Sequence, residues 1–162
     1  LTGRSVSEVT GRGTGVDDSA LALKVKVVEQ ALALHHPDPK DAWDVLVKVG
    51  GFEIGAIAGA CLAAAAERVP IVLDGFICTT GAALAIVLDP AVKPFLIASH
   101  RSTEPGHRHL LAWMGLDPLL ELDLRLGEGT GAALAMHLAE ASCRILTEMA
   151  TFSEARVSGR DP

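Results

Sequence analysis

A single carboxylate, Glu128, stands between two glycines in the segment DLRLGEGTGAAL, residues 123–134, just ahead of an alanine-rich run. As a first-turn residue this acid would interact favourably with the helix dipole and do no chemistry. Flanking glycines would also let a planar ligand approach closely, and a desolvated carboxylate there can act as a general base. The local sequence leaves both interpretations open.

The glycine-rich segment GRGTGVDD, residues 11–18, is a second candidate, because glycines let backbone N–H groups point at a phosphate near a helix start. It is neither a Walker loop nor G-x-G-x-x-G, since Asp17 takes the place of the last glycine. Lys24 lies at the border of the apolar stripe that follows, and helical side chains lean toward the N-terminus, so its amine can reach the loop. Lys26 points about 160° away from Lys24. An empty Asp-capped turn and a lysine that only covers the helix edge are the alternatives.

Polar residues also follow two of the expected strands. Asp74 ends the apolar run IVLD, where the carboxyl end of a parallel strand faces a ligand crevice, or where an Asx-type hydrogen bond caps the next turn. The segment SHRSTEPGHRH, residues 99–109, holds three histidines, but none has the i, i+4 spacing of a zinc helix, and Arg108 separates His107 from His109. We therefore expect a polar loop with one or two ligand contacts and no metal.

Helices and strands alternate along the chain and would position these residues. Apolar periodicity predicts helices over 18–34, 40–48, about 51–68, 78–88, 104–114 and 130–151. Short apolar or β-branched runs predict strands over 69–75, 93–100 and 119–125. Such alternation predicts an α/β fold, a Rossmann-like parallel sheet flanked by helices, with ligand sites where strands end and helices begin.

The expected last helix has two distinct faces. Its core stripe is expected to consist of Leu134, Leu138, Ile145 and Met149. On the opposite, exposed side, an i, i+4 ion pair is expected between Glu140 and Arg144.

Composition excludes several classes of protein. The 162 residues carry 14 Lys and Arg against 20 Asp and Glu, a net charge of −6, which argues against a nucleic-acid binder. The longest uncharged apolar stretch, residues 56–66, is too short to span a bilayer. Three scattered cysteines, Cys61, Cys78 and Cys143, read as small core residues of a reduced cytoplasmic protein and not as a disulfide framework or zinc site.

Five segments taken together resemble the nicotinate-nucleotide–dimethylbenzimidazole phosphoribosyltransferase family: GRGTGVDD…K, KVGGFEIGAIAGA, VPIVLDGFI, ASHRSTEPGH and RLGEGTGAALA. The likeness runs in order from about residue 3 to residue 153. It implies transfer of phosphoribose from nicotinate mononucleotide to 5,6-dimethylbenzimidazole, giving α-ribazole 5′-phosphate and nicotinate for cobalamin nucleotide-loop assembly. It also implies a cytoplasmic homodimer with a Rossmann-like large domain, a smaller helical domain, and no metal or other cofactor.

The same resemblance implies roles for single residues. Glu128 matches the general base of the family's LGEG motif, and Leu126 matches a residue that lines the benzimidazole pocket. Asp74 falls close to the ribose. The family positions that hold the 5′-phosphate match three residues of this chain, namely Gly13, Lys24 and Ser102.

One departure from the family concerns completeness. The family's GEMGIGNTT segment, which supplies phosphate-binding backbone and a second glutamate, belongs upstream of Leu1, and the opening LTG reads as the end of a helix. We expect residues 1–152 to be the C-terminal part of the phosphoribosyltransferase domain, incomplete by itself, and residues 153–162 to be a polar tail. Two alternatives stay open: a relative that ribosylates another lower-ligand base, such as adenine or a phenol, and a non-catalytic nucleotide-binding remnant.

Overall fold

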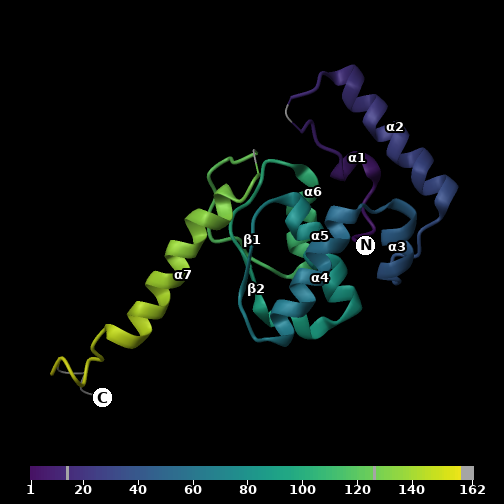
Figure 1. Ribbon diagram of the computed structural model, residues 1–162. Helices are drawn as coiled ribbons and strands as arrows, with labels where there is room; N and C mark the ends of the chain where they lie inside the picture. Colours follow the sequence, from purple (N-terminus) through teal and green to yellow (C-terminus); the bar gives the residue numbers. More distant parts are fainter. Residues whose placement is uncertain (14, 126, 158–162) are drawn as a thin grey trace, which may run out of the picture.

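Helices dominate the computed structural model, which describes residues 1–13, 15–125 and 127–157. In chain order its elements are α1 (Val6–Val9), α2 (Asp18–His35), α3 (Ala42–Val49), α4 (Phe52–Ala66), β1 (Ile71–Leu73), α5 (Phe76–Leu88), the 3₁₀ helix η1 (Pro90–Phe95), β2 (Leu96–Ala98), α6 (Pro105–Met114) and α7 (Thr130–Glu148). The two strands pair in parallel, with Ile71 opposite Leu96 and Leu73 opposite Ala98. The predicted α/β fold with a helix-flanked parallel sheet is thus confirmed (Figure 1).

The core lies where α4 packs against α5, and both helices contact β1. Its centre is made of small residues, since Ala82, Ala83 and Ala85 of α5 have no exposed surface. Larger aliphatic side chains, including Leu84 and Val92, close the rest of this cluster. Because aromatic residues make up only 4% of the chain, close approach of helices replaces large rings as the means of excluding water.

The sheet is smaller than the sequence predicts. Pro70 has no backbone N–H to donate, so β1 starts only at Ile71, after a turn beyond the end of α4 in which Arg68 adopts a φ of 58°. Residues 93–95 belong to η1, in which Pro90 and Pro94 fix the backbone. The strand predicted over 119–125 is wrong, because among these residues only Leu120 forms a bridge, in parallel with His100.

The predicted helices lie close to the observed ones in the sequence, but the faces predicted to be buried are not always buried. The core stripe predicted for α7 is wrong, because Leu134 is 45% exposed and Met149 is 67% exposed. The cause is that α7 touches the rest of the chain only near its start, where Gly131 and Ala135 are its buried residues, and then runs away from the body (Figure 1). The predicted ion pair is confirmed, since Arg144 Nη2 lies 2.8 Å from Glu140 Oε1 on the exposed rod.

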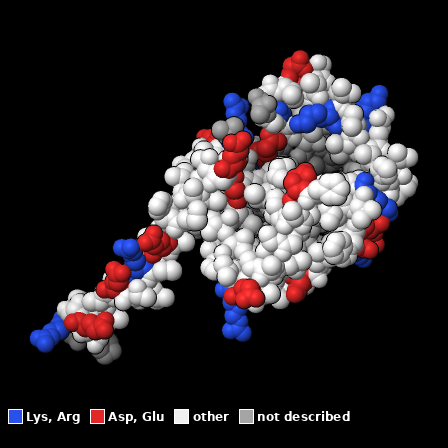
Figure 2. Space-filling model, viewed as in Figure 1, with Lys and Arg blue, Asp and Glu red and all other residues white. Residues whose placement is uncertain are grey.

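The cysteines differ in burial, and the charged side chains are spread over the surface. Cys61 is buried, which raises the pKa of its thiol, and Cys78 is half-buried. The core position predicted for Cys143 is wrong, because this residue lies on the projecting part of α7. Charged side chains form small scattered groups on the face shown in Figure 2. Among the described residues, no helix has the length and apolar character needed to cross a membrane.

Candidate functional site

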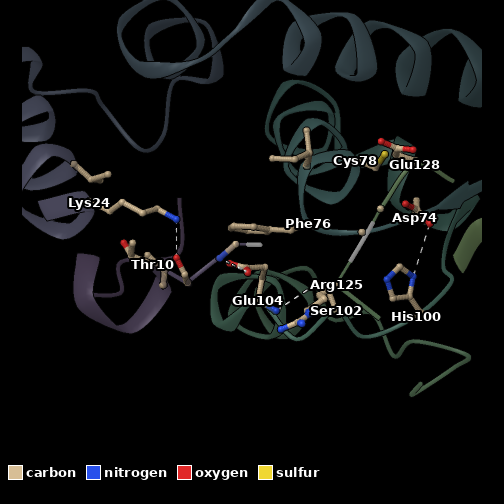
Figure 3. Close-up of a pocket in the computed structure, with 17 residues that line it drawn as sticks. Thr10, Lys24, Asp74, Phe76, Cys78, His100, Ser102, Glu104, Arg125 and Glu128 are labelled. Atoms are coloured by element: carbon tan, nitrogen blue, oxygen red, sulfur yellow. Dashed lines mark hydrogen bonds and ion pairs between the residues drawn. The ribbon is translucent and has the colours of Figure 1, made fainter. Parts of the chain in front are cut away.

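A cavity of about 630 Å³ opens between the N-terminal segment, the ends of the two strands and the turn before α7 (Figure 3). Five predicted site residues line it: Gly13, Lys24, Asp74, Ser102 and Glu128. The sixth, Leu126, lies outside the described residues, although its neighbours Arg125 and Gly127 line the cavity. Four segments that are distant in sequence therefore meet at one place.

Lys24 reaches the glycine-rich loop, as helix geometry predicts. Its Nζ donates a hydrogen bond to the Gly11 carbonyl oxygen at 2.7 Å, and a Cβ at Gly13 would lie 3.8 Å from the same amine. Gly13 adopts a φ of 58°, which glycine tolerates without strain. Asp17 begins α2 by accepting a hydrogen bond from the Ala20 N–H at 2.8 Å. The loop is thus tied to its helix by a cap and by a lysine.

Glu104 is a site residue that the sequence interpretation missed. Its Oε1 accepts a hydrogen bond from the Gly13 N–H at 2.9 Å, across 91 positions of sequence. The same carboxylate packs on Gly11, where an added Cβ would lie only 1.9 Å from Oε2. A carboxylate is therefore already bound to the loop for which a phosphate was predicted. Its membership of the polar segment 99–109 was the available signal, but its partner was not readable from the sequence.

A buried chain of hydrogen bonds holds the backbone of Ser102 in place. The Ser102 N–H donates to His107 Nδ1 at 3.1 Å, so the ring hydrogen must be on Nε2, which lies 2.9 Å from Thr79 Oγ1. The Thr79 hydroxyl in turn donates to the Gly75 carbonyl oxygen at 2.9 Å. Burial, and to a smaller extent the nearby His100, lowers the pKa of His107 to about 4. His107 is therefore a neutral structural residue at pH 7.

The histidines of segment 99–109 do not converge on one point. His100 and His107 are buried, with ring centroids 6.2 Å apart and planes at 68°, whereas His109 is half-buried further along α6. Across residues 1–13, 15–125 and 127–157, no group of three or more His, Cys, Asp or Glu side chains is placed to hold a metal ion. Hydrogen bonding and packing account for His100 and His107.

Asp74 lines the cavity but directs both carboxylate oxygens at the start of α7. Oδ2 accepts a hydrogen bond from the Gly129 N–H at 3.1 Å, and Oδ1 accepts one from the Ala132 N–H at 3.0 Å. The side chain is buried, and His100 Nδ1 lies 3.9 Å from Oδ1. Asp74 thus caps a helix, as one of its two interpretations proposed, but that helix is α7 and not the one that directly follows β1.

Glu128 stands at the rim of the cavity. It adopts a φ of 59°, which is uncommon for a residue other than glycine, and its side chain is exposed. The described residues do not desolvate the Glu128 carboxylate, because the turn is anchored through backbone N–H groups and leaves the side chain uncovered. In Figure 3, Phe76 lies between the Lys24 amine and the pair formed by Glu128 and Asp74.

Comparison with known proteins gives consistent matches along the whole chain. A family model described as phosphoribosyltransferase matches residues 1–157. The nicotinate-nucleotide–dimethylbenzimidazole phosphoribosyltransferase of Roseiflexus castenholzii is 62% identical over 160 residues, which cover 99% of this chain and 45% of that protein. The protein of the same name from Geobacter metallireducens is 59% identical, with 99% and 46% covered.

A solved structure agrees with these matches. The crystal structure of CobT from Thermus thermophilus superposes with a TM-score of 0.91 at 51% identity, covering 98% of this chain and 47% of that one. The chain thus spans a little under half the length of the relatives it matches.

Proposed function

This chain belongs to the nicotinate-nucleotide–dimethylbenzimidazole phosphoribosyltransferase family, and from that premise we propose that its cavity transfers phosphoribose from nicotinate mononucleotide to 5,6-dimethylbenzimidazole. The products are α-ribazole 5′-phosphate and nicotinate. The observation that carries the proposal is the meeting of Gly13, Lys24, Ser102 and Glu128 in one cavity. Residues 1–152 supply this part of the site, and residues 153–162 form a polar tail.

The proposed chemistry needs one base and no acid. The Glu128 carboxylate takes the N–H proton of the benzimidazole, and the other ring nitrogen attacks C1 of the ribose. The bond between C1 and the pyridinium nitrogen breaks, and its electron pair stays on that nitrogen. Nicotinate therefore leaves with a neutral ring, and no proton has to be delivered to it.

The 5′-phosphate has a defined place in this scheme. The Lys24 amine and the Gly13 N–H are its first partners, because a cation and a backbone donor that lie together at the glycine-rich loop can both bind an anion. Glu104 must then leave the Gly13 N–H, since two anions cannot share one donor without strong repulsion. We propose that the mononucleotide displaces this carboxylate as it binds.

The resemblance also supports a cytoplasmic homodimer for the full-length protein. Sedimentation equilibrium would test the dimer, with a monomer at micromolar concentration as the contradicting result.

The decisive experiment is a chimera. We would replace the 160-residue matching stretch of the Roseiflexus castenholzii protein with this chain and assay nucleotide formation from nicotinate mononucleotide and a panel of bases. Product with 5,6-dimethylbenzimidazole is expected. Product with adenine or a phenol alone would show that the chain belongs to an enzyme that ribosylates another lower-ligand base. A folded chimera that makes no product with any of these compounds would show that the chain is a non-catalytic remnant.

Glu128→Gln in this chimera tests the base directly. We expect kcat to fall by roughly 10²- to 10⁴-fold with little change in mononucleotide binding, because the amide cannot accept the proton. Glu140→Gln is the matched control, since Glu140 lies on the exposed rod of α7. Equal activity of the two variants would exclude Glu128 as the base.

A further inference from the structure

We infer that Asp74 is the positioning residue for Glu128: it fixes the turn that carries this carboxylate and keeps it out of the helix cap. The inference rests on the proposed function, because the placement of Glu128 affects a rate only if Glu128 takes a proton. It differs from the ribose contact that the resemblance implies, since here Asp74 acts through the backbone of the chain itself.

The first step is the capping of α7. A helix leaves its first N–H groups without intrahelical partners, and the residue before it often supplies an acceptor. Here that residue is Gly129, which has no side chain to do so. Asp74 takes over from 55 positions away, with Oδ2 on the Gly129 N–H at 3.1 Å and Oδ1 on the Ala132 N–H at 3.0 Å.

The second step is the rigidity of the acceptor. Asp74 directly follows β1 and is only 5% exposed, so its carboxylate has little freedom to move. Its own carbonyl oxygen accepts a hydrogen bond from the Ser99 hydroxyl at 3.2 Å, and the Ser99 N–H donates to the Leu73 carbonyl oxygen at 3.0 Å. The start of α7 is therefore tied to the paired strands and not to a loop.

A close packing contact holds the same helix turn from another side. A Cβ added at Gly131 would lie 1.9 Å from His100 Nδ1 and 2.5 Å from its Cε1. His100 is itself buried. The first turn of α7 packs on this ring only because Gly131 has no side chain, so the His100 ring and the Asp74 carboxylate together set where Glu128 lies.

The third step concerns what Glu128 would otherwise do. An acid at the start of a helix is attracted to the free N–H groups and to the helix dipole. Asp74 occupies two of those groups, and among the described residues none donates a hydrogen bond to the Glu128 carboxylate. Glu128 also holds a φ of 59°, a conformation that persists in a non-glycine residue when its surroundings enforce it. Its oxygens consequently remain available to a ligand in the cavity.

Asp74→Asn in the chimera tests this inference. The amide keeps one acceptor but turns an N–H₂ group toward the other backbone N–H, so one of the two hydrogen bonds is lost. We expect kcat to fall about 10- to 100-fold while KM for the mononucleotide stays within about twofold. The Asp74→Asn/Glu128→Gln double variant should be no slower than Glu128→Gln alone, because a misplaced base adds no loss where the base is gone.

Asp41→Asn is the matched control. Asp41 also accepts two backbone N–H groups at a helix start, from Trp43 and Asp44, but it is exposed and lies outside the cavity. Its replacement should leave kcat unchanged. Equal kinetics for Asp74→Asn and Asp41→Asn would overturn the inference. A raised KM, or losses that multiply in the double variant, would overturn it in favour of a direct contact with the ribose.

Backbone amide exchange gives a second measurement that needs no activity. In the unaltered protein the Gly129 and Ala132 N–H groups should exchange at least tenfold more slowly than that of Thr130, whose hydrogen bond to the Gly127 carbonyl oxygen is long, at 3.4 Å. Exchange at all three positions at one rate would overturn the inference, even if Asp74→Asn does not fold. An inactive chimera with protected Gly129 and Ala132 would instead remove the proposed function and leave the cap in place.

Discussion

The body of the molecule and its two outer helices are packed in opposite ways. In α5, six residues are buried, among them Leu84 and the alanines beside it. In α2 no residue is buried, and in α7 only Gly131 and Ala135 are. Figure 1 shows the two outer helices extending from opposite sides of the body.

The body stabilises the fold, and the outer helices carry groups that are proposed to bind and react. The body supplies the buried core and the fixed carboxylate of Asp74. The outer helices supply Lys24, from the second turn of α2, and the turn with Glu128 that begins α7. The apolar, uncharged helix α5 therefore stabilises the fold, and the Lys24 amine and the Glu128 carboxylate, which are proposed to do the chemistry, lie on the less packed segments.

The comparison is tested most strongly by one substitution made in both regions. Leu84 of α5 is 2% exposed, and Leu146 of α7 is 86% exposed. Leu84→Ala removes buried methyl groups and leaves a cavity, so we expect the free energy of unfolding to fall by about 2–5 kcal/mol. Leu146→Ala should change it by less than about 0.5 kcal/mol. Urea unfolding followed by circular dichroism measures both, and similar losses would mean that α7 is packed in solution.

The same contrast explains what the sequence could predict. The bounds of α2 and α6 depend on local signals, an Asp cap before one and a proline at the start of the other, and both were predicted within one residue. The exposure of Leu134 depends on whether another surface covers it, which periodicity cannot tell.

The candidate site divides in the same manner. Lys24 reaches Gly11 across 13 positions, a contact that helix geometry predicts. The contacts from Glu104 to Gly13 and from Asp74 to α7 span 91 and 55 positions and depend on the three-dimensional fold. Local sequence therefore predicted residues that line one cavity, and the fold decided which groups they meet.

The second prediction uses the buried histidine of the body. Burial, with a smaller contribution from His100, lowers the pKa of His107 to about 4 from its ordinary value of 6.5. Between these values the unfolded chain binds a proton that the folded chain does not. The free energy of unfolding should therefore fall as the pH is lowered from 6.5 to 4, by roughly 3 kcal/mol, and the stabilisation is complete above pH 6.5.

The measurement is the unfolding midpoint as a function of pH in matched buffers. His107→Gln should lose this part of the pH dependence, because glutamine does not titrate. His35→Gln is the control, since His35 lies exposed in the last turn of α2. A pH profile of His107→Gln that parallels the unaltered protein would show that His107 has the same pKa in the folded and the unfolded chain, and would contradict the prediction.

The smallest expected effect concerns α2 and binding alone. Lys24→Ala in the chimera should weaken nicotinate mononucleotide binding about 10- to 100-fold, the range for losing a hydrogen bond between charged groups. Stability should change by less than about 0.5 kcal/mol, because Lys24 lies on a helix without buried residues. Calorimetric titration with the mononucleotide measures the first quantity and urea unfolding the second.

Lys26→Ala is the matched control, because it removes the same charge from the same helix on a side about 160° away from Lys24. If only the net charge of the chain mattered, both variants would weaken binding equally and added salt would remove the difference from the unaltered protein. If the amine contacts the phosphate at the glycine-rich loop, Lys24→Ala alone weakens binding. That result would establish α2 as a segment that contributes to the ligand site without contributing to the core, which is the division that the comparison of body and outer helices predicts.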